Sequence, residues 1–222
     1  MLKKTKICAT VLLVAVCFAV AMLTNIPSWL KIKKGDIKDI ETVEANTLES
    51  GDLVKGTINT VLGACAEEYS TKFGIRTSSK SSKLYYVLWL ENDNLILYET
   101  GNKSEYDTLD KITEETKAYF DSYEEAQKSG NLEDVKLPAT TFSIEGRVTS
   151  VPSKIQGYFK EWYDDDAEFD KNTEKVMITR CDFDGMDINI YIGFGCAVLA
   201  VVMLVVTLIV WKKEKEENSY GY

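Results

Sequence analysis

Histidine is missing from this chain, since none of its 222 residues is a histidine. Histidine is the side chain most often used as a general base near neutral pH and as a zinc ligand, and it completes Ser–His and Cys–His nucleophile pairs. No other nucleophile–base motif stands out. We therefore expect a protein that is not an enzyme, with no catalytic residues and no cofactor.

Cysteine is scarce as well, with five in the whole chain. Three of them lie in long apolar stretches, where they serve most simply as small apolar residues. Only Cys65 and Cys181 lie in the polar part of the sequence. We expect two separate buried thiols there, and a disulfide between them is the alternative that an oxidising compartment would permit.

Positive charge is outweighed by negative charge. Residues 24–189 hold 20 Lys and Arg against 32 Asp and Glu, a net charge of −12. A nucleic-acid partner needs a basic face, so this balance predicts no nucleic acid among the partners and argues against binding to anionic lipid headgroups.

What the sequence does have is one long apolar stretch near each end. Residues 7–30 and 188–211 each run 24 residues without a charged side chain. As a helix, either stretch is about 36 Å long, and the hydrocarbon core of a bilayer is about 30 Å thick. The sequence predicts two transmembrane helices, with the lipid bilayer as a partner.

The lysines around these stretches predict the orientation. Three precede the first stretch and three follow the second: Lys3, Lys4, Lys6, Lys212, Lys213 and Lys215. Short lysine-rich flanks stay in the cytoplasm. At the first stretch the rule is ambiguous, because Lys31, Lys33 and Lys34 follow it directly. The second stretch decides the orientation, because Arg180 is the only basic residue near its entry. We expect a plasma-membrane protein with both termini cytoplasmic and the central domain outside.

The first stretch also has features of a cleaved signal peptide, including a small-x-small site at Ala19-Val20-Ala21. Its apolar run is longer than a usual signal core, so we favour a retained helix. The expected organisation is a cytoplasmic N-terminus (1–6), a first span (7–30), a linker (31–51), an extracytoplasmic domain (52–187), a second span (188–211) and a cytoplasmic tail (212–222).

Alternation of apolar residues predicts the elements of the central domain. Strands are expected at 53–61, 84–90, 95–100, 140–151 and 176–183, helices at 61–69, from residue 107 or 108 to Gly130, and after Pro152, and an acidic loop at 164–172. Segment 84–90 is apolar on both faces, as in a central strand. This order predicts a β-rich α+β domain, an OB-like five-stranded barrel with helical insertions. The alternative is an α+β sheet with helices on one face.

Four motifs carry a resemblance: VKGTI, LYYVLWL, IEGRV and YFKEWYDD, enclosed by the two apolar stretches. The chain resembles an uncharacterised family of two-pass membrane proteins of Gram-positive gut-type bacteria, a domain of unknown function, over most of its length. That family has no established activity, so the resemblance implies the topology and no site.

Two groups of residues are candidates for binding. Asp182, Asp184 and Asp187 alternate around a glycine as in calcium loops, but the bidentate glutamate of such loops is missing, so a solvated turn is the favoured interpretation. Tyr85, Trp89 and Tyr98 lie on the hairpin that OB-type barrels use for ligands, although a doubly apolar hairpin places most such residues in the core.

We expect a non-enzymatic membrane protein that displays an acidic interaction or accessory domain. Its partner would be a membrane or surface protein, or another copy of the chain through the transmembrane helices, which carry small residues four apart, such as Ala15/Ala19 and Gly193/Ala197. The alternative is a sensor that binds peptide, glycan or cation and signals through a partner protein.

Overall fold

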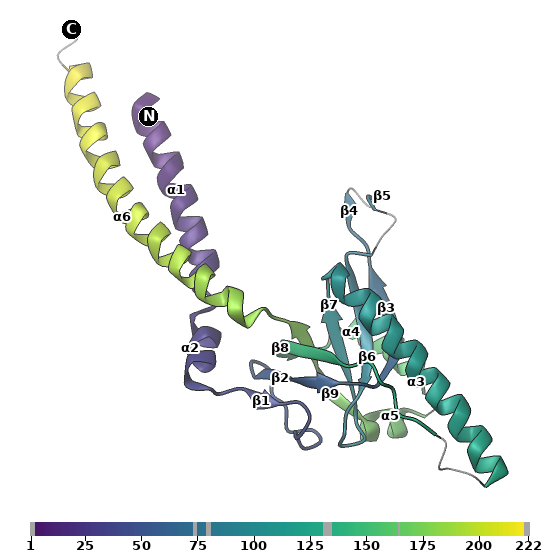
Figure 1. Cartoon of the computed structure of the whole chain (residues 1–222). Coiled ribbons are helices and arrows are strands. Elements are labelled where there is room, and N and C mark those ends of the chain that lie inside the picture. The colour runs from purple at the N-terminus through teal and green to yellow at the C-terminus, as the bar shows by residue number, and fades with distance from the viewer. Residues whose placement is uncertain (1–2, 73–74, 79–80, 131–134, 164, 220–222) are drawn as a thin grey trace. The chain divides into compact units, whose positions relative to one another are not determined.

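The computed structural model describes residues 3–72, 75–78, 81–130, 135–163 and 165–219 (Figure 1). The chain forms two compact units: Met1–Gly35 together with Asp182–Tyr222, and Asp36–Cys181 between them. We describe each unit by itself.

The first unit is built on two long helices, α1 (Lys3–Leu23) and α6 (Phe183–Ser219), which pack along one another. The segment Lys4–Lys34, which contains most of α1, and the segment Phe183–Glu217 of α6 are each long and apolar enough to cross a membrane. The more buried residues of α1 recur at alternating spacings of three and four: Thr5, Cys8, Leu12, Ala15, Ala19 and Met22. Because this period brings the same face of a helix to its neighbour at every turn, the two helices meet along one continuous seam.

The uncharged stretch 7–30 is not one helix. Helix α1 ends at Leu23, and α2 (Ile26–Lys34) begins after Thr24 and Asn25. Pro27 lies in the first turn of α2, where the missing N–H of a proline is tolerated. In the interior of one long helix the same proline would remove a backbone hydrogen bond, so it favours a new helix starting here. Helix α2 ends at Gly35, whose φ of 71° is left-handed.

The second unit is a mixed seven-stranded sheet in the order β1-β2-β8-β9-β7-β6-β3. Its strands are β1 (Lys38–Asp39), β2 (Leu53–Ile58), β3 (Val61–Glu68), β6 (Lys83–Trp89), β7 (Leu95–Thr100), β8 (Phe142–Ser150) and β9 (Thr173–Arg180). The pairs β1–β2 and β7–β9 are parallel and the others antiparallel. A separate ribbon, β4 (Thr71–Lys72) with β5 (Ile75–Arg76), lies between β3 and β6 in the chain.

The connection between β2 and β3 constrains the shape of this sheet. The two strands are joined by residues 59–60 alone, although four strands lie between them in the sheet order. In a flat sheet, five strand spacings of about 4.8 Å would separate them by about 24 Å. Two residues span much less than that. The sheet therefore curls until the start of β3 returns to the end of β2.

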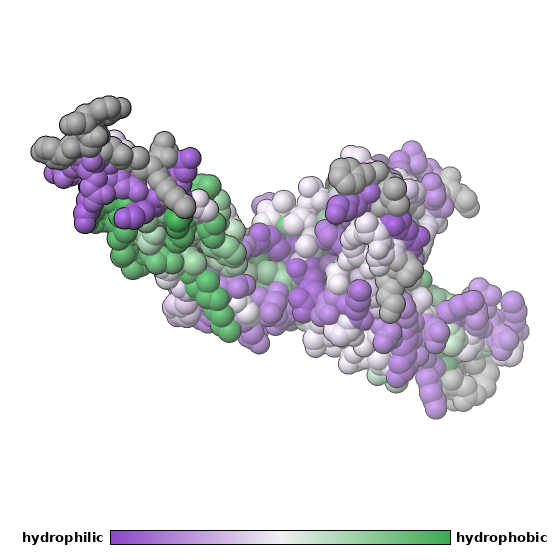
Figure 2. Space-filling model, turned by 90° about the horizontal axis from the view of Figure 1, so that it is seen from above, coloured by the Kyte–Doolittle hydropathy of each residue, from purple (hydrophilic) through white to green (hydrophobic). Residues whose placement is uncertain are grey.

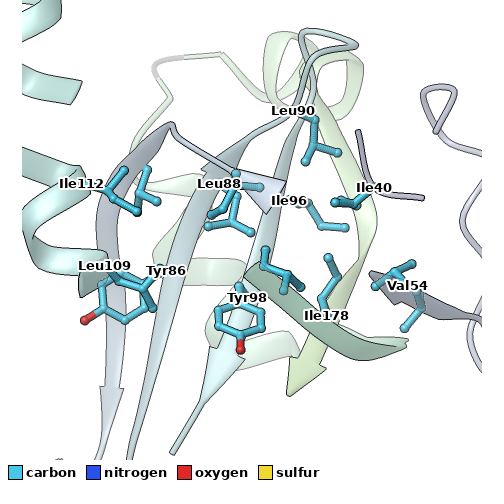
Figure 3. Close-up of a cluster of buried hydrophobic side chains, with 14 of the residues drawn as sticks. Ile40, Val54, Tyr86, Leu88, Leu90, Ile96, Tyr98, Leu109, Ile112 and Ile178 are labelled. Atoms are coloured by element: carbon cyan, nitrogen blue, oxygen red, sulfur yellow. The ribbon is translucent and has the colours of Figure 1, made fainter. Parts of the chain in front are cut away.

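Apolar side chains cover both faces of the sheet. One face carries Tyr86, Leu88, Ile96, Tyr98 and Ile178, packed with Leu109 and Ile112 of α3 (Lys103–Ser129), as Figure 3 shows. The opposite face carries Tyr85, Val87, Leu97 and Met177, packed with Ile155 and Phe159 of α4 (Ser153–Lys160) and Phe169 of α5 (Asp166–Asn172). The α+β layout expected from the sequence is therefore present, with helices on both faces.

Several expected elements are confirmed. Strands β6 and β7 form the antiparallel hairpin, and Asp93 in its turn has a φ of 65°. Ile144 and Val148 of β8 point into the core as the alternation predicts. Helix α3 ends at Gly130 in the left-handed conformation, although it begins at Lys103, earlier than expected, because the Asn102 side chain accepts a hydrogen bond from the Ser104 backbone N–H.

Two assignments were wrong. The helix expected at 61–69 is strand β3, whose pairing with β6 slips between Val61 and Gly63 and again between Ala64 and Ala66. Each bulge shifts the alternation by one residue and so imitates a helical period. The acidic loop expected at 164–172 contains α5, because the Asp165 side chain caps that helix by accepting from the Ala167 backbone N–H.

The stretch 31–51, expected as a linker, is structured. It contains the end of α2 and strand β1, and two of its side chains, Ile40 and Leu48, are buried in the core of the second unit. The two units meet in sequence at Gly35/Asp36 and at Cys181/Asp182.

Candidate functional site

The three aspartates considered as cation ligands begin α6. Asp182 accepts a hydrogen bond from the Gly185 backbone N–H at 2.9 Å, which caps the first turn of the helix. Asp187 accepts from Trp29 Nε1 and from Lys33 Nζ, both at 2.6 Å. Among the described residues, no group of three or more His, Cys, Asp or Glu is arranged to hold a metal ion. The structure thus gives Asp182 and Asp187 local capping and pairing roles.

The three aromatic residues considered as a ligand face do not share one surface. Tyr85 and Tyr98 are 2% and 1% exposed and lie in the cores on opposite faces of the sheet. Trp89 is half-buried and stacks on Phe120 of α3, with ring centroids 5.5 Å apart and planes 9° from parallel. Burial raises the pKa of both tyrosines well above the usual value, consistent with neutral core side chains.

Helices α4 and α5 cover the face that holds Tyr85. Phe159 and Phe169 form an edge-to-face pair with centroids 5.2 Å apart, and Tyr163 packs edge-on against both. Tyr158 and Trp162 of the same segment are more exposed, at 38% and 43%. The segment between β8 and β9 therefore closes one sheet face with its own aromatic cluster.

The two cysteines of the second unit lie far apart in its sheet. Cys65 is in β3 and Cys181 directly follows β9, and β7 and β6 separate these strands. Three strand spacings amount to about 14 Å, more than a disulfide spans. Burial raises the pKa of the Cys65 thiol to about 11, so Cys65 remains protonated near neutral pH.

A buried carboxylate closes one end of the α1–α6 pair. Glu214 of α6 accepts hydrogen bonds from the Thr5 hydroxyl at 2.6 Å and from the backbone N–H groups of Lys4 and Thr5 at 3.0 and 3.2 Å. The first N–H groups of a helix have no partner within it, and here the neighbouring helix supplies one. In the sequence, the sign of this contact is one glutamate that lies among Lys212, Lys213 and Lys215.

The other end of the pair is closed by the contact of Asp187 with Trp29 and Lys33, described above, which joins α6 to α2. Between the two polar contacts the seam consists of apolar and small residues. At Gly193, an added Cβ would lie 2.8 Å from Leu23 Cδ2 and 2.9 Å from Met22 Cβ. At Gly195, two residues on, an added Cβ would have nothing within 4 Å. The helices approach closely at Gly193 because it lacks a side chain.

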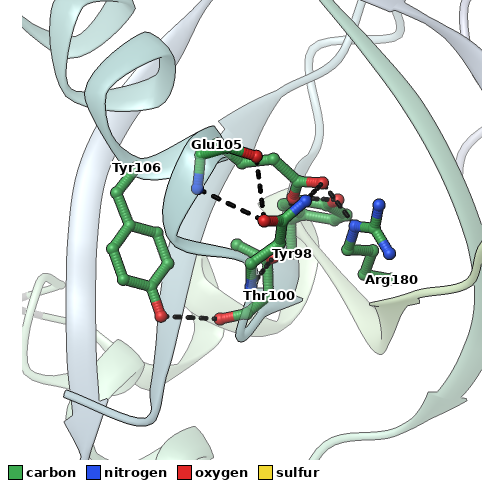
Figure 4. Close-up of polar contacts among 7 residues, drawn as sticks. Tyr98, Thr100, Glu105, Tyr106 and Arg180 are labelled. Carbon is green, nitrogen blue, oxygen red and sulfur yellow. Dashed lines mark hydrogen bonds and ion pairs between the residues drawn. The ribbon is translucent and has the colours of Figure 1, made fainter.

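A dense polar network of the second unit surrounds Glu105 in the first turn of α3 (Figure 4). Its carboxylate accepts from the Tyr98 hydroxyl at 3.0 Å, the Thr100 hydroxyl at 2.7 Å and the Asn102 amide at 3.0 Å, and it pairs with Arg180 at the end of β9. Burial pushes its pKa up, but the four donors outweigh burial and hold the pKa below its ordinary value.

Sequence reasoning missed this network. Glu105 is one acidic residue among many, and its donors come from β7, the turn before α3, and β9. Arg180 is the one member of the network that the sequence analysis named, as the only basic residue near the entry to the second apolar stretch. The network ties Arg180, the last residue of β9, to the start of α3, and Arg180 lies two positions before the first unit resumes at Asp182.

The surface of the second unit carries shallow clefts. The larger, about 350 Å³, lies between α3 and residues 136–139 and is lined by Tyr119, Leu137 and Pro138. The smaller, about 270 Å³, lies beside β2 and β8, and the carboxylates of Asp39 and Glu41 there accept hydrogen bonds from backbone N–H groups.

Comparison with known proteins gives a family and no activity. No curated protein and no solved structure matches the chain. The model of a domain of unknown function, DUF8577, matches residues 1–210, which agrees with the resemblance to an uncharacterised family. Because that match extends over nearly the whole sequence, the chain belongs to the DUF8577 family.

Proposed function

We propose that this chain is a two-pass membrane protein that holds residues 36–181 outside the cell as a non-enzymatic interaction module. The observation that carries the proposal is the α1–α6 pair, which has a continuous apolar surface and a polar contact at each end. In Figure 2 the hydrophobic residues of this pair form a continuous band, bordered by hydrophilic residues. A soluble protein rarely exposes so large an apolar surface.

The length of the pair supports a membrane crossing. In α1, the uncharged part from residue 7 to Leu23 is about 26 Å long, and in α6 the part from Gly193 to Trp211 is about 28 Å. Both values are close to the thickness of the hydrocarbon core. The polar contact of Glu214 and Thr5 then lies at one interface, and that of Asp187 and Trp29 lies at the other.

The charged flanks support the orientation. The Glu214 end carries the lysines of both termini, so it is the cytoplasmic end. The seam also favours a retained first helix. Cleavage after Ala21 would remove the partner of Glu214 and expose the seam face of α6, including Ala200 and the backbone at Gly193.

The external domain is an OB-type barrel in which β2 and β3 are two halves of one interrupted first strand. Such barrels close in the order 1-2-3-5-4-1, with strands 3 and 5 parallel and a helix between strands 3 and 4. The order β3-β6-β7-β9-β8-β2 matches this when β6 to β9 are strands 2, 3, 4 and 5. The parallel β7–β9 pair and the position of α3 between β7 and β8 agree with the assignment.

This assignment favours a protein partner over a small ligand. OB-type barrels bind ligands on the face of strands 2 and 3, and here α4 and α5 cover that face with Phe159 and Phe169. The exposed aromatics Tyr158 and Trp162 lie on the outside of this cover. Large, partly rigid aromatics are enriched in protein–protein contacts. The acidic charge balance of the domain argues against nucleic acid as the partner.

The topology is tested in whole cells with single cysteines in a chain whose five native cysteines are replaced by alanine. A membrane-impermeant maleimide should label Lys128→Cys in α3 without lysis, and should label Lys213→Cys only after lysis. The protein should also remain in the membrane after alkaline carbonate extraction. Labelling of Lys213→Cys but not Lys128→Cys in intact cells, or extraction by carbonate, would overturn the proposal.

The interaction role is tested by photo-crosslinking in the same cells. A photoreactive amino acid at Tyr158 or Trp162 should give a discrete crosslinked product with a membrane or surface protein. The same amino acid at Lys111, on an exposed part of α3, should not. Equal or absent crosslinking at all three positions would contradict a partner on this surface.

A further inference from the structure

Five exposed lysines lie beside the contact between Thr5 and Glu214. The hydrogen bond between these two residues places one end of α1 next to one end of α6. A helix rises about 1.5 Å per residue, so residues up to two positions from the contact lie within about 3 Å of its level along the axis. The lysines within that range form one group, the lysine cluster: Lys4 and Lys6 of α1, and Lys212, Lys213 and Lys215 of α6.

The two helices contribute lysines to the same sides of their seam. They run antiparallel, since the start of α1 meets the end of α6 at this contact and the end of α1 meets Gly193. Each residue of a helix is turned by about 100° from the one before, so Lys4 and Lys213, each directly before the contact, lie on one side. Lys6 and Lys215, each directly after it, lie on the other. Each side of the seam therefore presents one lysine from each helix to a single phosphate.

The lysine cluster keeps most of its charge available at the surface. Among the residues that the structure describes, the ammonium groups of Lys6, Lys212 and Lys213 make no hydrogen bond or ion pair. Lys215 lies over Trp211, with its Nζ 5.5 Å from the ring centroid. A contact with an aromatic ring attracts an ammonium group without neutralising its charge. These four positive charges are therefore available to an anion.

The glutamates near the lysine cluster do not cancel its charge. Glu214 is buried in the seam, where it caps α1, and it interacts electrostatically with Lys4. Glu216 and Glu217 follow the cluster farther along α6. Five lysines against these three glutamates leave a net charge of +2 at this end of the helix pair.

The lysine cluster borders the apolar surface of the helix pair. Ile7 of α1 and Ile209 of α6 are 61% and 62% exposed, and Trp211 is 49% exposed. Figure 2 shows the hydrophobic band and the hydrophilic residues that border it. Tryptophan is enriched where a membrane meets water. On the membrane crossing proposed above, the lysine cluster lies at the level of the headgroups in the cytoplasmic leaflet.

We infer that the lysine cluster binds anionic phospholipid headgroups of the cytoplasmic leaflet. The inference rests on the proposed membrane crossing. A lipid phosphate accepts strong hydrogen bonds from ammonium groups, and each lysine near an anionic surface strengthens the attraction about fivefold. Orientation in the membrane requires only positive charge at this end of the chain. The placement of one lysine from each helix on each side of the seam goes further, because it allows one headgroup to link α1 to α6.

The experiment measures which lipid lies beside the lysine cluster. The full chain, with its five cysteines replaced by alanine, carries Ile209→Cys labelled with bimane. It is placed in phosphatidylcholine nanodiscs that contain 20 mol% of brominated phosphatidylglycerol or of brominated phosphatidylcholine. We expect the anionic brominated lipid to quench bimane about two- to threefold more than the neutral one. Lys6→Gln/Lys212→Gln/Lys213→Gln leaves two lysines against three glutamates, so it should lower that ratio to about one.

Two further measurements separate lipid binding from a general effect of substitution. The matched control Lys103→Gln/Lys117→Gln/Lys175→Gln removes three exposed lysines of the second unit and should leave the ratio unchanged. In the parent protein, 1 M NaCl shortens the Debye length to about 3 Å and should lower the ratio toward one without any substitution.

Equal quenching by the two lipids in the parent protein would overturn the inference while leaving the membrane crossing intact. A ratio that neither the Lys6→Gln/Lys212→Gln/Lys213→Gln variant nor 1 M NaCl lowers would do the same. Quenching by neither lipid would show that Ile209 does not reach the bilayer, and would overturn the proposed crossing together with the inference. Loss of the ratio on addition of 10 mM inorganic phosphate at constant ionic strength would indicate a site for free phosphate and would likewise contradict a lipid site.

Discussion

The Thr5 hydroxyl in α1 donates a hydrogen bond of 2.6 Å to Oε2 of Glu214 in α6. The same carboxylate accepts from the backbone N–H groups of Lys4 and Thr5, so a residue of one helix caps the first turn of the other. Capping of this kind normally comes from the residue just before a helix. Here it fixes how far α1 and α6 can slide along one another.

Replacement of Glu214 by alanine should therefore loosen the first turn of α1. Loss of a helix cap costs about 1 kcal/mol, which corresponds to about fivefold faster opening. Hydrogen exchange followed by mass spectrometry should show that acceleration in a peptide covering residues 3–8. Glu216→Ala changes an exposed residue two positions further along α6; it is the control and should leave the exchange unchanged. Unaltered protection in Glu214→Ala would mean that the contact does not cap the helix.

The close approach at Gly193 gives a second prediction. Gly193→Ile should force α1 away, because the new side chain would overlap Leu23 and Met22. A Thr5→Cys/Glu214→Cys pair in a background without other cysteines reports on the approach by disulfide formation. We expect a severalfold loss of crosslinking with Gly193→Ile and little change with Gly195→Ile, whose site is open. Equal crosslinking in both variants would remove the glycine contact from the seam.

Trp89 gives a prediction about the hairpin. It is half-buried and stacked on Phe120, so Trp89→Ala should lower the free energy of unfolding of residues 36–181 by about 3 kcal/mol, the low end for a large aromatic. Chemical denaturation measures this. A double-mutant cycle with Phe120→Ala should give a coupling of about 1 kcal/mol. A stability change near zero, with no coupling, would show that Trp89 serves a surface role instead.

Much of the fold was predictable from local patterns. The hairpin at 84–100 follows from two apolar runs around Asn92-Asp93-Asn94, and the end of α3 follows from Gly130. These signals lie within a few residues of one another. Strand β3 was not predictable in this way, because its bulges at Gly63 and Ala66 come from pairing with β6, far along the chain. Because a bulge inserts one extra residue into a strand, the apolar residues there recur neither every two residues, as in a regular strand, nor every 3.6, as in a helix.

The candidate sites were less predictable than the fold. Tyr85 and Tyr98 differ by 13 positions, and only the sheet places them on opposite faces under different helices. Asp187 was expected in a solvated turn and Glu214 was not singled out, yet each contacts a residue more than 150 positions away. Such contacts depend on how α1, α2 and α6 pack, and charge patterns along the chain contain no record of that packing.

Glu105 provides a prediction about acid stability. Its folded-state pKa lies below the ordinary value, although burial acts in the opposite direction. A carboxyl group with a depressed folded pKa contributes stability above the unfolded pKa, about 4.3, and the contribution is lost as the pH falls through the folded pKa. Glu105→Gln should therefore destabilise residues 36–181 at pH 7 by about 1.5–3 kcal/mol, because charged acceptors make the stronger hydrogen bonds.

The difference between parent and Glu105→Gln should then shrink as the pH is lowered from 5 to 3. Urea denaturation at a series of pH values measures it. Glu115 of α3 also has a lowered pKa, since it accepts hydrogen bonds from the Thr140 hydroxyl and backbone N–H. Both proteins should therefore still lose some stability as the pH falls. Glu114→Gln, an exposed neighbour, is the control and should follow the parent at every pH. A Glu105→Gln difference that is constant from pH 7 to pH 3 would show that the network stabilises the fold through packing, not through the charge of Glu105.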